Sequence, residues 1–158
     1  MKKLAFAILM CVAAMSAKAQ VLTSKTMNNV YEAVTNQTNS DYAFNAEWNG
    51  DDITTMFVYK KECGYKGVVT LKPHRKYVYS YAADGTLTSR IAYHWVDGED
   101  GWICAARHDY ALVGDKYYAE YSRYNHSTNN FSLPVEQMVY QLIGDTPVTA
   151  EPLLLAEK

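Results

Sequence analysis

Hydrophobic and polar residues alternate along the middle of the chain with a period of two. The clearest stretch runs from Tyr77 to Tyr81, where tyrosines alternate with Val78 and Ser80. A second stretch places Leu87, Ile91, Tyr93 and Trp95 in alternation with Thr88, Arg90 and His94. Because successive side chains of a strand point to opposite faces, this period is typical of half-buried strands. The pattern therefore predicts an all-β protein.

Short loops are expected to join the alternating segments into antiparallel hairpins. Residues 83–85, Ala-Asp-Gly, suit a three-residue loop whose final glycine adopts the left-handed conformation. Such a loop brings Tyr81 near Leu87. The next hairpin, 91–95 and 102–112, sets Trp95 opposite Trp102 when it is folded symmetrically about the loop at 96–101. A cross-strand aromatic pair of this kind stabilises by roughly 0.2–1 kcal/mol relative to an alanine pair.

The same arrangement recurs at a fixed distance along the chain. Tyr124 and Phe131 lie 29 residues after Trp95 and Trp102, which predicts another hairpin with Tyr124 opposite Phe131. The hexapeptide Tyr-Ala-Leu-Val-Gly-Asp at 110–115 returns as Tyr-Gln-Leu-Ile-Gly-Asp at 140–145, with a fainter copy at 81–86. A fixed period indicates one supersecondary unit laid down several times.

The fold predicted from these patterns is an antiparallel meander of repeated β-hairpins with one face packed. The repeat is 29–30 residues long. We expect about five strands in 75–143 and two or more before them, a usual size for a sheet.

Four segments follow from this reading of the chain. They are a signal peptide at 1–19, an extended or irregular N-terminal segment at 20–55, a β-hairpin repeat domain at 56–145 and a C-terminal tail at 146–158. The segment at 20–55 is rich in Asn, Thr and Ser, with scattered apolar positions. The tail contains Pro147 and Pro152 and is expected to leave the repeat.

The first nineteen residues have the form of an export signal. Lys2 and Lys3 precede an apolar run from Leu4 to Met15, and Ala17 and Ala19 are the small residues that a signal peptidase reads. The run is too short to span a bilayer as a permanent helix. We therefore expect cleavage after Ala19, a location in the periplasm or outside the cell, and no membrane span after cleavage.

Removal of this segment makes the remaining chain more acidic. Three lysines leave with it, so 12 basic residues face 17 acidic ones, and the net charge becomes −5. This charge argues against a surface that binds nucleic acid. The remaining 139 residues are enough for a single domain with a hydrophobic core.

Two cysteines, Cys63 and Cys104, remain after cleavage. An oxidising compartment allows them to form a disulfide, which would stabilise by about 3–4 kcal/mol through the unfolded state. The alternative is two separate thiols that pack as small hydrophobic side chains. The sequence leaves both possibilities open, because it does not fix the distance between the sulfur atoms.

Motifs for catalysis, metal binding and cofactor binding do not stand out in the sequence. The four histidines lack the paired spacing of a zinc helix, and there is no two-cysteine knuckle. Neither a nucleophile elbow nor a glycine-rich phosphate loop occurs. We therefore expect no catalytic residue, no metal and no cofactor, and a non-enzymatic protein.

The chain is rich in aromatic residues, with 14 tyrosines and 3 tryptophans. Most are explained as strand formers with buried rings and wet hydroxyl groups. On the strand that follows residue 116, however, aromatic side chains fall on both faces, so one set is expected to be exposed. The candidate contact residues for a ligand are Trp95, Trp102, Tyr117, Tyr121, Arg123 and Tyr124.

Several of these stretches resemble a known family. The motifs that carry the resemblance are Phe57-Val58-Tyr59, the run from Lys76 to Tyr81, the Asp84-Gly85 turn, Ala92-Tyr93-His94-Trp95, Trp102, the run from Glu120 to Asn125, and Val139-Tyr140. Together they resemble domain of unknown function 3836, a family of small secreted proteins from gut-dwelling Gram-negative anaerobes. The resemblance implies a β-rich periplasmic or exported protein and supplies no catalytic residue.

The expected function is non-enzymatic recognition of a glycan or a protein in the periplasm or outside the cell. Exposed aromatic residues next to Arg and Asn suit either kind of partner. The alternative is a structural or assembly component of the cell envelope that pairs through a free strand edge. A hydrolase ranks third, because the sequence shows no site for one.

Overall fold

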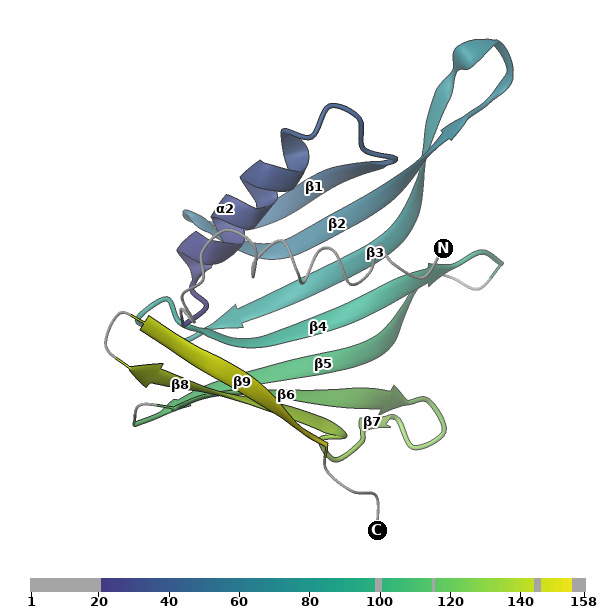
Figure 1. Ribbon diagram of the computed structural model, residues 1–158. Helices are drawn as coiled ribbons and strands as arrows, with labels where there is room; N and C mark the ends of the chain where they lie inside the picture. Colours follow the sequence, from purple (N-terminus) through teal and green to yellow (C-terminus); the bar gives the residue numbers. More distant parts are fainter. Residues whose placement is uncertain (1–20, 99–100, 115, 144–145, 155–158) are drawn as a thin grey trace.

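A computed structural model describes residues 21–98, 101–114, 116–143 and 146–154. Its strands form an antiparallel sheet in the order β1-β2-β3-β4-β5-β6-β8-β9, and the short β7 pairs with β6 (Figure 1). The strands are β1 (Tyr42–Asn49), β2 (Asp52–Cys63), β3 (Val69–Tyr81), β4 (Leu87–Val96), β5 (Gly101–Val113), β6 (Lys116–Asn125), β7 (Asn130–Phe131), β8 (Glu136–Ile143) and β9 (Thr146–Leu154). The predicted antiparallel meander is confirmed, and the sheet is open, with β1 and β9 at its edges.

The predicted strand registers are also confirmed. Trp95 pairs with Trp102 between β4 and β5, and Tyr124 pairs with Phe131 between β6 and β7. At the β3–β4 hairpin, Tyr81 pairs with Leu87, and Gly85 has a φ of +81°. The glycine is needed there because side chains strongly disfavour a positive φ.

The N-terminal segment differs from the prediction that 20–55 is extended or irregular. It contains helix α2 (Ser24–Thr35) and strand β1 (Tyr42–Asn49), and β2 begins at Asp52. The apolar residues of α2 are Met27, Val30, Tyr31 and Val34, at the spacing of one helical face. Polar residues between them concealed this spacing in the sequence.

The C-terminal tail was also predicted wrongly within the described residues. Instead of leaving the sheet, 146–154 forms β9, which pairs antiparallel with β8. Pro147 and Pro152 are compatible with this strand because β9 lies at the sheet edge. Proline lacks an N–H, and an edge strand has one side on which no partner is required.

Helix α2 lies against one face of the sheet, over β1 and β2 (Figure 1). We call this the inner face and the opposite one the outer face. The hydrophobic core lies between the helix and the sheet, and its buried members are Met27, Ile53, Met56, Tyr79 and Leu87. One face is therefore packed, as predicted. The far end of the β2–β3 hairpin projects from the body of the molecule (Figure 1).

The predicted signal peptide, 1–19, lies outside the described residues. Among the helices that the structure does describe, none has both the length and the apolar character needed to cross a membrane.

Helix α2 begins with a capping box that can be tested by mutation. The hydroxyl of Thr23 accepts a hydrogen bond from the Thr26 amide at 3.3 Å, and the Thr26 hydroxyl accepts one from the Thr23 amide at 3.3 Å. Thr23→Ala leaves the Thr26 amide without its acceptor, so we expect a loss of about 1 kcal/mol in unfolding free energy by urea titration. Thr38→Ala, an exposed site after the helix, serves as the control. An equal effect of both changes would contradict a capping role for Thr23.

Candidate functional site

The six candidate contact residues divide between the two faces of the sheet. Trp95, Trp102 and Tyr124 lie on the outer face. Tyr117, Tyr121 and Arg123 lie on the inner face, because their cross-strand partners Leu112, His108 and Ala106 share that face with the core. This division follows from the alternation of side chains along β6. The six residues therefore cannot act as one site.

The outer face carries a group of partly buried aromatic rings from several strands. We call this group the outer aromatic surface, and its members are Phe57, Tyr93, Trp95, Trp102, Tyr124 and Phe131. The Trp95 and Trp102 rings meet edge to face with centroids 5.3 Å apart, and Phe57 lies 6.1 Å from Trp102. Tyr124 and Phe131 meet at 5.1 Å, again edge to face. The two hairpins therefore have the same edge-to-face aromatic pair next to their loops.

Two cations are inserted among these rings. The Lys76 ammonium lies 4.4 Å from the centre of the Tyr93 ring and 5.4 Å from that of Trp102. The Arg107 guanidinium lies 4.6 Å from the centre of the Phe131 ring. A cation over an aromatic face is attracted by the ring quadrupole. Neither residue was among the sequence candidates, because only the strand register places each one beside a ring.

Beside the aromatic surface, polar side chains form a row across three strands. Asp109 on β5 pairs in register with Glu120 on β6, and Glu120 pairs with Gln137 on β8. The Gln137 amide donates a hydrogen bond to the Glu120 carboxylate. Together with Tyr110, Ala111, Val113 and Tyr118 they line a shallow hollow of about 300 Å³.

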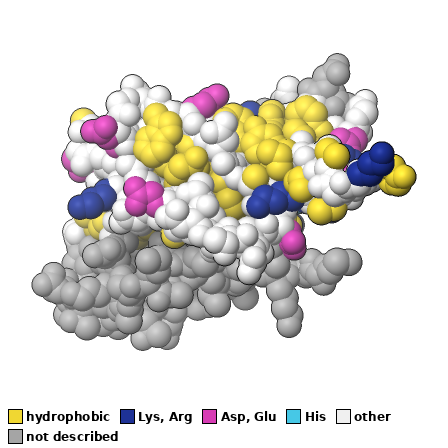
Figure 2. Space-filling view, turned by 90° about the horizontal axis from the view of Figure 1, so that it is seen from above, with side chains coloured by type: hydrophobic (Ala, Val, Ile, Leu, Met, Phe, Trp, Pro, Cys, Tyr) yellow, Lys and Arg dark blue, Asp and Glu magenta, His cyan; other side chains and the backbone are white. Residues whose placement is uncertain are grey.

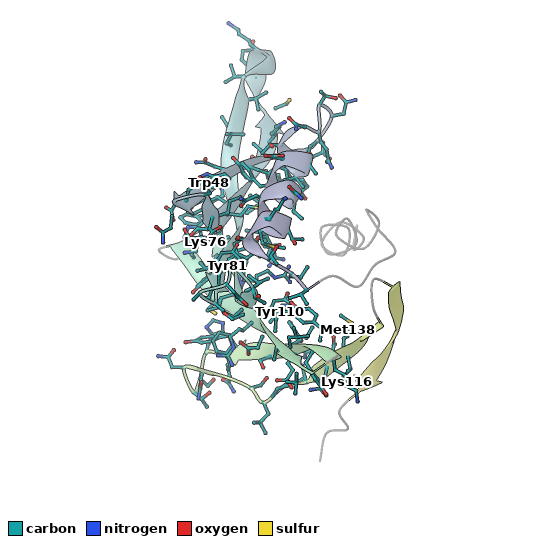
Figure 3. The ribbon with its side chains drawn as sticks, turned by 90° about the vertical axis from the view of Figure 1, so that its left-hand side faces the viewer. Trp48, Lys76, Tyr81, Tyr110, Lys116 and Met138 are labelled. Carbon is teal, nitrogen blue, oxygen red and sulfur yellow. The ribbon has the colours of Figure 1, made fainter. Side chains whose placement is uncertain are left out.

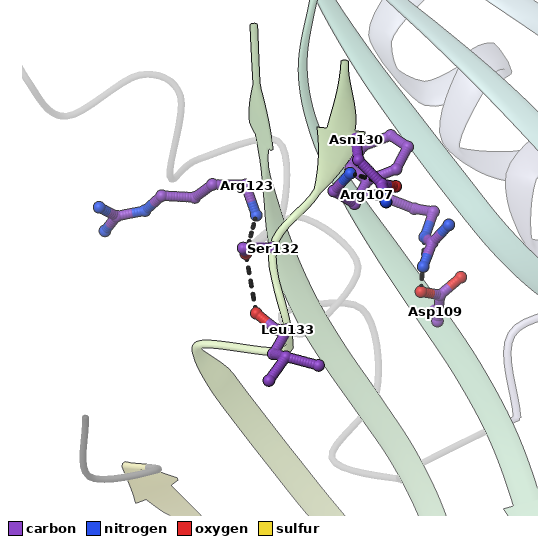
Figure 4. Close-up of polar contacts among 7 residues, drawn as sticks. Arg107, Asp109, Arg123, Asn130, Ser132 and Leu133 are labelled. Carbon is purple, nitrogen blue, oxygen red and sulfur yellow. Dashed lines mark hydrogen bonds and ion pairs between the residues drawn. The ribbon is translucent and has the colours of Figure 1, made fainter. Parts of the chain in front are cut away.

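Arg107 connects the hollow to the aromatic surface. Its Nε donates to Asp109 Oδ2 at 2.6 Å (Figure 4). Its guanidinium lies over the ring of Phe131. Arg123 points away from this pair in the same view, and its backbone amide donates to Ser132 Oγ at 3.1 Å. Arg107, and not Arg123, is therefore the arginine of the outer site.

Burial affects two titratable groups on the outer aromatic surface. Burial is the largest cause of a raised pKa of the Tyr93 hydroxyl, and the nearby Cys104 and Tyr124 raise this pKa further. Desolvation also raises the pKa of the Cys104 thiol. Both groups therefore remain neutral at neutral pH, and the positive charge of this surface comes from Lys76 and Arg107.

The inner face holds a second aromatic group around Arg90 and His108. Arg90 Nη2 lies 3.2 Å from His108 Nδ1, and the His108 ring lies 4.9 Å from that of Tyr121. Burial, together with the Arg90 charge, lowers the pKa of His108 to about 4. Tyr117 is buried, at 4% exposure, beside Tyr110, and Tyr110 and Met138 lie on the inner side of the sheet in Figure 3. Tyr117 and Tyr121 therefore contribute to packing here.

Both cysteines are free thiols in the structure. Cys63 is exposed at the end of β2, and Cys104 is on β5, with β3 and β4 between the two strands. Within the described part of the chain, no group of three His, Cys, Asp or Glu side chains is arranged to hold a metal ion.

Three crystal structures resemble this fold. A DUF3836 family protein from Bacteroides vulgatus ATCC 8482 matches with a TM-score of 0.57 and 20% identity, covering 63% of this chain and 98% of that protein. A DUF3836 family protein from Parabacteroides distasonis ATCC 8503 matches with a TM-score of 0.54 and 21% identity, covering 64% and 90%. A protein with unknown function from Bacteroides fragilis NCTC 9343 gives 0.53 and 19%, covering 74% and 94%.

At these identities the three structures establish a shared fold alone. No curated protein matches the chain. The sequence model described as "Family of unknown function (DUF3836)" matches residues 1–142 of the 158. The resemblance seen in the aromatic and turn motifs is thus confirmed, and the chain belongs to the DUF3836 family.

Proposed function

We propose that this protein is exported and that it binds a glycan through the outer face of its sheet without catalysing a reaction. The observation that carries the proposal is the position of Arg107, which joins the ring of Phe131 to the carboxylate of Asp109. Aromatic rings and a polar hollow therefore occupy one continuous surface. Export is supported by the charged start, apolar run and small residues within 1–19.

The two halves of this surface match the two kinds of group on a sugar. The C–H faces of a sugar ring pack on aromatic rings, which supply large rigid contact areas. Its hydroxyl groups donate to carboxylates and accept from amides, and Asp109, Glu120 and Gln137 offer both in one row. Small-ligand sites commonly combine apolar walls with a few fixed polar groups in this way.

Substitution of Trp102 tests whether the outer aromatic surface binds the glycan, independently of its effect on stability. We expect Trp102→Ala to weaken glycan binding at least about tenfold, since a stacking anchor of this size contributes 1–2 kcal/mol or more. Trp48→Ala is a matched control, because Trp48 is 48% exposed on β1 and packs on Tyr31 rather than on the outer aromatic surface. Affinity is measured by calorimetry with the glycan that binds best, at a temperature where both variants are folded.

A second pair of variants tests the polar row. Glu120→Gln keeps the side-chain shape and removes one carboxylate from the hollow, so we expect weaker binding, while Glu32→Gln on the exposed surface of α2 should have no effect. Equal affinities for Trp102→Ala, Glu120→Gln and both controls would exclude the outer face as the binding site.

An assembly role in the cell envelope is the second candidate, and the open sheet favours it. Strands β1 and β9 are edges that present unpaired backbone groups, to which another strand can be added. A ligand-binding module should remain monomeric, whereas an assembly component should self-associate as its concentration rises. Sedimentation over a wide concentration range distinguishes the two.

A further inference from the structure

The β2–β3 hairpin extends beyond its neighbouring strands as a two-stranded arm, residues 60–72. Strand β1 pairs with β2 only as far as Lys60, and β4 pairs with β3 only from Arg75 onward. The arm closes through the short turn η1 (Tyr65–Gly67), where the Gly64 amide donates to the Val68 carbonyl at 2.8 Å. It projects from the upper right of the molecule in Figure 1.

The end of this arm exposes several large hydrophobic side chains to solvent. Tyr65 is 88% exposed, Val68 60%, Val69 52% and Leu71 54%. A single exposed hydrophobic residue is ordinary, but four within one hairpin form a patch. Neither strand of the arm could bury these side chains on the other, because a two-stranded ribbon has no second layer.

The arm has the opposite charge to the rest of the chain. Residues 60–72 contain Lys60, Lys61, Lys66 and Lys72 against the single acid Glu62, a net charge of +3 in a chain of net charge −2. Glu62 is neutralised by Lys72, whose Nζ lies 3.0 Å from its Oε2. Figure 2, which looks down on the molecule from above, shows Lys or Arg side chains directly beside hydrophobic ones at its right-hand end.

The strand register places lysines on both faces of the arm. Lys60 pairs with Lys72 on one face of the arm, and Val69 pairs with Cys63 on the other. The Val69 face also carries Leu71, which pairs with Lys61, and is continuous with Tyr59. At the tip, the Lys66 ammonium lies 5.6 Å from the centre of the Tyr65 ring. The arm therefore combines an exposed apolar tip with lysines on both of its faces.

We propose that this arm docks on the surface of a membrane that contains anionic lipids. The apolar tip enters the boundary between headgroups and acyl chains, where membrane-surface segments that combine apolar and basic side chains are held. The lysines contact lipid phosphates, and each contributes favourably near a negative surface. An uncharged membrane accommodates the apolar tip but does not attract the lysines. The positive charge of the arm therefore favours an anionic surface. This proposal does not depend on glycan recognition by the outer face.

Vesicle binding tests the proposal directly. The chain from residue 20 onward is mixed with vesicles of phosphatidylcholine, or with vesicles that also contain phosphatidylglycerol, and the bound fraction is measured by co-sedimentation. We expect at least about tenfold stronger partition onto the anionic vesicles, and loss of that preference as salt is added.

Variants identify the arm as the contacting element. Lys60→Glu with Lys66→Glu should lower partition onto anionic vesicles at least about tenfold, while Lys25→Glu with Lys116→Glu, at exposed sites elsewhere, should lower it less. Tyr65→Ser with Val68→Ser should also release the protein. Leu133→Ser, at a site 86% exposed outside the arm, is the apolar control.

Three results would overturn the proposal. They are equal partition onto both kinds of vesicle, no partition onto either, or anionic binding that the arm variants leave unchanged. The arm substitutions are at exposed positions, so the variants should fold, and circular dichroism checks this.

Discussion

Ile53→Ala should lower the free energy of unfolding by about 3–4 kcal/mol, the largest effect expected for a single substitution here. Ile53 has 0% exposure and belongs to the same buried core cluster as Met27 and Leu87. Truncation removes buried methyl groups and leaves a cavity between α2 and the sheet. Strand β2, which carries Ile53, is paired with β1 on one side and β3 on the other, so the cavity can collapse only in part.

Urea titration of wild type and variant measures this difference, with Leu133→Ala as the control. Leu133 is 86% exposed, so its truncation should change stability by less than about 0.5 kcal/mol. The backbone carbonyl of Ile53 also accepts a hydrogen bond from the Tyr81 hydroxyl at 2.8 Å. The alanine variant keeps this hydrogen bond, because the acceptor is a backbone atom. A loss below about 1 kcal/mol for Ile53→Ala would show that α2 does not pack on β2 as described.

Acidification should destabilise the protein through His108, with an effect of about 2–3 kcal/mol. Burial first, and then the Arg90 charge, lowers the pKa of His108 from the ordinary 6.5 to about 4. The folded state therefore resists the proton that the unfolded chain accepts. The contribution of neutral His108 to the free energy of unfolding is therefore complete above pH 6.5 and is lost as the pH falls toward 4.

Substitution of the histidine isolates this contribution. His108→Gln should reduce the loss of stability between neutral pH and pH 4, measured by urea titration at several pH values, whereas His126→Gln at an exposed loop should not. A smaller dependence should remain, because burial also lowers the pKa of His74. An NMR titration that finds the His108 pKa near 6.5 would contradict the described contact with Arg90.

The hairpin registers were predictable from the sequence because each is fixed by a local signal. The alternation around Tyr79, the glycine at position 85 and the seven-residue interval from Trp95 to Trp102 each specify pairing between neighbouring segments. The same interval from Tyr124 to Phe131 predicted the second pair. In a meander, neighbouring segments are partners, so local signals determine most of the sheet.

Features that depend on tertiary packing were not predictable in the same way. The helical spacing of Met27 and Val34 becomes clear only when the sheet supplies a surface for that face of α2. The tail forms a strand because β8 offers an unpaired edge, which overrides the proline signals.

The candidate site was predicted in part. Trp95, Trp102 and Tyr124 lie together on the outer face, but Lys76 and Arg107 were not singled out. Each of these cations contacts a ring on another strand, far away in the sequence. A single sequence does not show which face of a strand is covered, so the inner location of Tyr117 could not be predicted either.

The most direct test of glycan recognition is binding of the chain from residue 20 onward to an array of host and bacterial glycans, with a heat-unfolded sample as control. Our account predicts binding to a defined set of glycans by the folded protein, and loss of that binding on unfolding. Absence of binding by the folded protein, or equal binding by the unfolded sample, would contradict it.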